Sequence, residues 1–161
     1  MPLLLWKNGP GLWQKCTLPR GQVQNRICSM SEIQEFVLRG GQRLTAGSMA
    51  EFLKKIPFVK AKAETVDAPG FPHLRVQAGF LARYVEDVLE GAYSCGDLSA
   101  AAEAVFALGY LLRDVDIIPD EVSSAGYSDD SAVLRAVLEA HPDEFIGFAE
   151  ASGISPVSIE P

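Results

Sequence analysis

The most apolar segment of the chain, residues 98–112, limits the folds that this sequence can adopt. Its one charged residue is Glu103, and on a helix its apolar side chains would lie on nearly every face. A helix with this pattern is stable in water when other helices surround it, so we expect it at the centre of a bundle. A membrane-spanning helix needs about 20 apolar residues, and this segment is shorter.

Further helical patterns lie on both sides of this segment. Residues 73–91 give the strongest one, because their apolar side chains fall largely on one stripe. Before it, helices are expected at 31–39, ending at Gly40-Gly41, then after Thr45, and then at 58–66, where Pro57 is either a kink or a new start. After the apolar segment, helices are expected at 129–140, with Ser128 as N-cap, and from Pro142 to Gly153. No strand pattern of any length stands out. The sequence therefore predicts an all-α fold, a small helical bundle with a central apolar helix and an acidic loop shaped by Pro119 and Gly126.

Charge and turn-forming residues divide the chain into segments. Residues 1–69 contain ten Lys/Arg and five Asp/Glu, whereas residues 70–161 contain four and sixteen. Residues 1–29 have no acid and no sustained apolar period, so we expect either disorder or a mis-assigned start, because the sequence from Met30 reads like an ordinary protein start. The breaker at 67–72 separates a basic region of short helices, 30–69, from a helical domain, 70–153, and 154–161 form a tail.

Composition excludes several classes of function and location. The net charge of −7 argues against nucleic acid as the main partner. The three cysteines, Cys16, Cys28 and Cys95, are odd in number and widely spaced, which argues against a zinc site and a disulfide framework. Reduced thiols and an N-terminal apolar run too short for a signal peptide indicate a cytoplasmic protein.

An Asp-Ile-Ile-Pro-Asp loop at 116–120, followed by Gly-Tyr-Ser-Asp-Asp at 126–130, comes between two helical patterns. This order and spacing resembles the YkvA-like family, a bacterial domain of unknown function, over roughly residues 100–140. The resemblance implies a small helical protein of a kind often assigned to membranes on hydropathy. Arg113-Asp114 and the segment 121–124 make this loop more polar than the family pattern, so membrane association is not the interpretation that we favour.

The acids of this loop admit two interpretations. Asp116, Asp120, Asp129 and Asp130 could converge, and a hard cation such as Mg²⁺ or Ca²⁺ would then offset their mutual repulsion. The spacing is not that of an EF-hand. We favour the alternative, in which Asp116 and Asp120 cap turns while Asp129 and Asp130 stabilise a helix start, because capping alone explains acids at these places.

No pattern in the sequence indicates a catalytic centre. A nucleophile elbow, a P-loop and a dinucleotide fingerprint are all missing. His73 and His141 stand beside prolines at helix boundaries, where a capping or surface role is expected. We therefore expect a non-enzymatic interaction or regulatory module with a protein partner and no cofactor. The alternatives are a divalent-cation site on the 114–130 loop and peripheral membrane association through the basic stretch 54–62.

Overall fold

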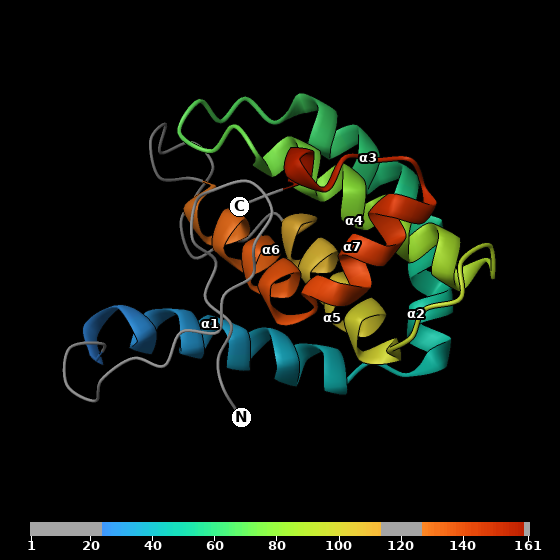
Figure 1. Ribbon diagram of the computed structural model, residues 1–161, viewed down its shortest axis with the longest axis horizontal. Coiled ribbons are helices and arrows are strands. Elements are labelled where there is room, and N and C mark those ends of the chain that lie inside the picture. The colour runs from blue at the N-terminus through green and yellow to red at the C-terminus, as the bar shows by residue number, and fades with distance from the viewer. Residues whose placement is uncertain (1–23, 114–126, 160–161) are drawn as a thin grey trace.

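The computed structural model describes residues 24–113 and 127–159, and every regular element in them is helical (Figure 1). The α-helices are α1 (Gln24–Gln42), α2 (Ala46–Phe52), α3 (Ile56–Thr65), α4 (Leu74–Leu89), α5 (Leu98–Leu111), α6 (Ser128–Ala140) and α7 (Pro142–Ala151). The 3₁₀ helix η1 (Leu53–Lys55) continues α2, and a second one, η2 (Pro156–Ile159), follows α7. The predicted all-α bundle is confirmed.

The apolar helix α5 is the centre of the bundle, as predicted. It contacts α1, α4 and α6, and nine of its fourteen residues are buried. Figure 1 shows α1 running along one side of the molecule, with α5 and α6 next to it and α3 and α4 beyond them. Because each neighbour covers a different face of α5, no long face of this helix meets water.

The helix predicted at 31–39 is longer than expected, and its predicted end is wrong. α1 begins at Gln24 and continues through Gly40 and Gly41 to Gln42. A Cβ atom on Gly40 would overlap the Phe106 ring of α5, and one on Gly41 would lie 2.8 Å from Cγ of Glu103. The two glycines therefore allow α1 to approach α5 closely, and they do not end the helix.

The proposed boundary between residues 29 and 30 falls inside α1. Residues 1–23 lie outside the described residues, so disorder or a mis-assigned start stays a prediction for them.

Other local predictions hold at specific residues. Thr45 caps α2, because the Ser48 backbone N–H donates to Thr45 Oγ1 at 3.2 Å. Pro57 was expected either to kink a helix or to begin a new one, and it begins one, because it lies in the first turn of α3.

The predicted N-cap of α6 is wrong by one residue. Ser128 is already helical, and Tyr127 occupies the N-cap position without a side-chain capping hydrogen bond. The predicted ends of α4 and α7 are confirmed. Gly91 and Gly153 follow these helices with φ angles of 77° and 67°, which glycine adopts without the steric cost that a Cβ would bring.

We expect Gly41→Ala to lower the free energy of unfolding by about 1–3 kcal/mol, the usual range for overpacking, because the backbone of Glu103 also lies within 3.2 Å of the added Cβ. Gly79→Ala in α4 is the matched control. Its Cβ would meet nothing within 4 Å, so the better helix propensity of Ala should stabilise the protein by up to about 1 kcal/mol. Urea denaturation measures both, and equal stability of the two variants would contradict the packing role of Gly41.

Candidate functional site

The predicted acidic site is described in part. Asp129 and Asp130 lie in the first turn of α6, whereas Asp116 and Asp120 lie outside the described residues. The predicted convergence of the four carboxylates is therefore untested. Among the residues that the structure describes, no group of three or more His, Cys, Asp or Glu side chains is placed to hold a metal ion.

Asp129 and Asp130 have different environments although they are adjacent. Asp129 Oδ2 accepts a hydrogen bond of 2.8 Å from the Tyr110 hydroxyl at the end of α5, and Oδ1 accepts one of 3.1 Å from the Asp130 backbone N–H. Asp130 is only 1% exposed. Both acids stand where the helix dipole favours negative charge, as predicted, but the contact of Asp129 with α5 was missed. A Tyr at the end of an apolar helix was the available signal, since a buried Tyr hydroxyl usually finds a partner.

A second polar cluster lies at the junction of α6 and α7, around His141. Its Nε2 atom is 3.0 Å from Glu103 Oε2, and its Nδ1 atom is 3.9 Å from Asp97 Oδ2. The His141 and Glu103 side chains are only 14% and 4% exposed. Of the capping or surface role predicted for His141, the cap position is confirmed, since His141 is the C-cap of α6 and the N-cap of α7, whereas the surface role is wrong. Glu103, the charged residue of the central helix, belongs to a buried ion pair.

The acids around His141 determine its protonation. Burial by itself would lower the pKa of the imidazole, because a charged ring loses its hydration. Contact with Glu103, and the negative charges of Asp97 and Glu144, outweigh that effect. The pKa of His141 is therefore raised above its ordinary value, and the protonated ring is favoured.

Glu144, in the first turn of α7, connects this junction to two other parts of the bundle. Its Oε1 accepts a hydrogen bond from the Tyr84 hydroxyl of α4, and its Oε2 accepts one from the Gly96 backbone N–H, each at 3.0 Å. Burial, with the charge of Glu144, raises the pKa of Tyr84 and of Cys95. Since the thiolate is the nucleophile, a raised pKa makes Cys95 a poor one.

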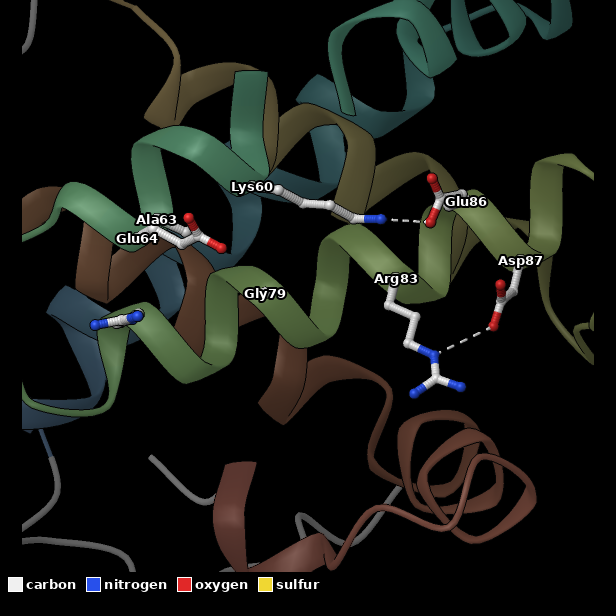
Figure 2. A pocket seen from close by; sticks show the side chains of 8 residues that line it. Lys60, Ala63, Glu64, Gly79, Arg83, Glu86 and Asp87 are labelled. Atoms are coloured by element: carbon white, nitrogen blue, oxygen red, sulfur yellow. Dashed lines mark hydrogen bonds and ion pairs between the residues drawn. The ribbon is translucent and has the colours of Figure 1, made fainter. Parts of the chain in front are cut away.

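A hollow of about 470 Å³ lies between α3 and α4. Figure 2 shows Lys60 reaching from α3 to Glu86 on α4, and Arg83 beside Asp87 along α4. The Lys60–Glu86 distance is 2.6 Å and the Arg83–Asp87 distance is 3.7 Å. Lys60, one of the residues of the predicted basic stretch, thus has an acidic partner within the chain.

The described helices include none with both the length and the apolar character needed to cross a membrane. In a comparison with known families, residues 100–135 match the model of a family described as "Protein of unknown function (DUF1232)". No curated protein and no solved structure matches the chain. The matched range contains Tyr110, Asp129 and Asp130 together with most of α5, so the part of the chain similar to this family is the central helix, the acidic loop and the start of α6.

Proposed function

We propose that this protein is a non-enzymatic interaction module that binds an acidic protein segment through α3. The observation that carries the proposal is Phe58, whose side chain is 67% exposed on a helix that buries Ile56, Val59 and Ala63. We call Lys55, the last residue of η1, together with Phe58 and Lys62 of α3, the α3 face.

Helical spacing puts the three residues of the α3 face on one side. Lys55 precedes Phe58 by three residues and Lys62 follows it by four, and residues three or four apart are neighbours on a helix. An aromatic side chain supplies apolar contact area, and aromatic residues are enriched at the centres of protein interfaces. Lysines at the rim favour a partner of opposite charge and speed its encounter. The chemistry of this face therefore fits an acidic segment with an apolar side chain.

A membrane surface fits this face less well than a protein does. A helix that lies on a membrane presents an apolar side along its length, whereas the α3 face has one large apolar residue. In the basic stretch, Lys54 pairs with Glu51 at 2.9 Å and Lys60 pairs with Glu86 at 2.6 Å. These contacts reduce the charge that is available to anionic lipids.

The YkvA-like identity of the helical domain is part of the proposal. It is supported by the Asp-Ile-Ile-Pro-Asp and Gly-Tyr-Ser-Asp-Asp motifs and by a family match that spans both.

A photo-reactive benzoylphenylalanine in place of Phe58 should cross-link, in the host cell, to protein segments that carry net negative charge. The same residue in place of Leu98 is the matched control, since Leu98 is 68% exposed on α5 and lies outside the α3 face. Lys55→Glu and Lys62→Glu, added to the variant with benzoylphenylalanine at position 58, should lower its cross-linking yield about tenfold, which corresponds to ~1.4 kcal/mol of binding free energy. Mass spectrometry of the adducts identifies the cross-linked segments.

Three results would overturn this proposal: adducts with lipid at position 58, adducts with protein segments of no particular charge, or equal yields at positions 58 and 98. Lys55, Phe58 and Leu98 have exposed side chains, so substitutions there should change the free energy of unfolding by no more than about 0.5 kcal/mol, whereas Lys62 is half-buried. A thermal melt of each variant checks this requirement.

A divalent-cation site on the 114–130 loop is the second candidate. The observation that favours it is the burial of Asp130 beside Asp129, whose carboxylate is oriented by Tyr110. Buried carboxylates are as a rule paired, hydrogen-bonded or bound to a metal, and hard cations prefer carboxylate oxygens.

If this loop holds a cation, millimolar CaCl₂ or MgCl₂ should raise the melting temperature of the wild-type protein, because a ligand that binds the folded state stabilises it. Asp130→Asn should abolish the increase. Glu150→Gln is the control, because Glu150 is an exposed acid near the end of α7. Absence of any change with either salt would remove the cation site from consideration.

A further inference from the structure

We propose that His141 and Glu103 form a pH-responsive latch that holds the α6–α7 junction against α5 and loosens as the pH rises. The proposal concerns the junction alone and does not depend on the partner of the α3 face.

The position of His141 makes it suited to hold this junction. It follows the last residue of α6 and precedes Pro142, the first residue of α7. Its backbone also takes part in both helices: the N–H donates to Val137 O at 3.3 Å, and the carbonyl accepts from the Phe145 N–H at 3.2 Å. A shift of the His141 side chain away from α5 would therefore disturb the end of one helix and the start of the next.

Glu103 is enclosed at this contact. It is 3% exposed, and its Cγ lies so close to Gly41 of α1 that a Cβ there would approach it to 2.8 Å. The backbone of α1 thus covers the stem of Glu103 while His141 Nε2 faces its carboxylate at 3.0 Å. Within the part of the chain that the structure describes, His141 is the cation with which Glu103 pairs.

The other groups that face His141 have the same charge sign as Glu103. They are Asp97 at the N-cap of α5 and Glu144 in the first turn of α7. Gly41 of α1, which has no titratable group, packs against Glu103, and the Phe145 ring meets the His141 imidazole edge-on with ring centroids 6.3 Å apart. These acids hold a proton on His141 but cannot replace it as the partner of Glu103.

The direction of the pH dependence follows from these charges. Three acids raise the pKa of His141 in the folded protein above the value of about 6.5 that is usual for an exposed imidazole. Below a pH of about 6.5, where the ring is protonated in both the folded and the unfolded protein, the latch contributes its full stabilisation. As the pH rises through the folded pKa of His141, the ring loses its proton and Glu103 loses the cation with which it pairs, which is strongly unfavourable in a buried site. The latch therefore loosens on the alkaline side.

Amide hydrogen exchange followed by NMR at pH values from 6 to 9 tests the latch, with rates corrected for intrinsic exchange. The protection of the Phe145 amide should fall with rising pH by up to about tenfold per pH unit, since one proton is linked to opening. The Glu90 amide, bonded to Glu86 O at the end of α4, should keep its protection. In His141→Gln the pH response of the Phe145 amide should disappear. His73→Gln is the control, because it changes the chain's other histidine, which is exposed and precedes α4, and this variant should respond like the wild type.

Two results would overturn the latch. One is an NMR titration of the wild-type protein in which the pKa of His141 is not above the value of about 6.5 that is usual for an exposed imidazole. The other is an equal loss of protection at Phe145 and Glu90, since that would indicate a change in global stability. If His141→Gln does not fold, Glu103→Gln takes its place: it should abolish the pH response of Phe145 and lower the pKa of His141, because contact with Glu103 raises that pKa.

Discussion

Burial of α5 on every side is the constraint on which the rest of this structure depends. Leu108 and Leu111 are fully buried, and each apolar side chain of that size contributes about 1.5–3 kcal/mol when it leaves water. The helices around α5 are shaped to make this burial complete. α1 approaches it through Gly40 and Gly41, where any larger residue would overlap Phe106 or Glu103. On another side, α4 packs its apolar stripe against α5.

Surrounding α5 also creates a problem, because the helix carries a carboxylate into the core. Glu103 is compensated by His141 from the α6–α7 junction. The same arrangement recurs at two other places, where Asp129 of α6 accepts from Tyr110 of α5 and Glu144 of α7 accepts from Tyr84 of α4. In each case the partner comes from a different helix, so these contacts fix how the helices sit against one another, whereas apolar packing alone tolerates more than one arrangement.

Most helices of this protein could be predicted from local patterns, and the errors have a common origin. α4, α5 and α7 follow from apolar spacing and from the stop signals at Gly91 and Gly153, which are local properties. Gly40-Gly41 looked like another stop signal. A pair of glycines reads the same in sequence whether it ends a helix or lets a second helix approach, and that choice depends on α5, about 60 residues away. The candidate site was predictable to a similar extent: Asp129 and Asp130 fall at a helix start, but nothing local connects them to Tyr110.

By itself, the sequence determined that this chain forms a helical bundle around residues 98–112, because a helix that is apolar on every face has no other stable place in water. It also determined most turns, since glycine and proline restrict the backbone locally. Tertiary structure alone decided the role of the polar residues within the bundle. Glu103 and His141 are 38 positions apart in the sequence, and neither has a local pattern that points to the other. They meet because α6 packs against α5, and at 3.0 Å in a buried setting their charges become interdependent.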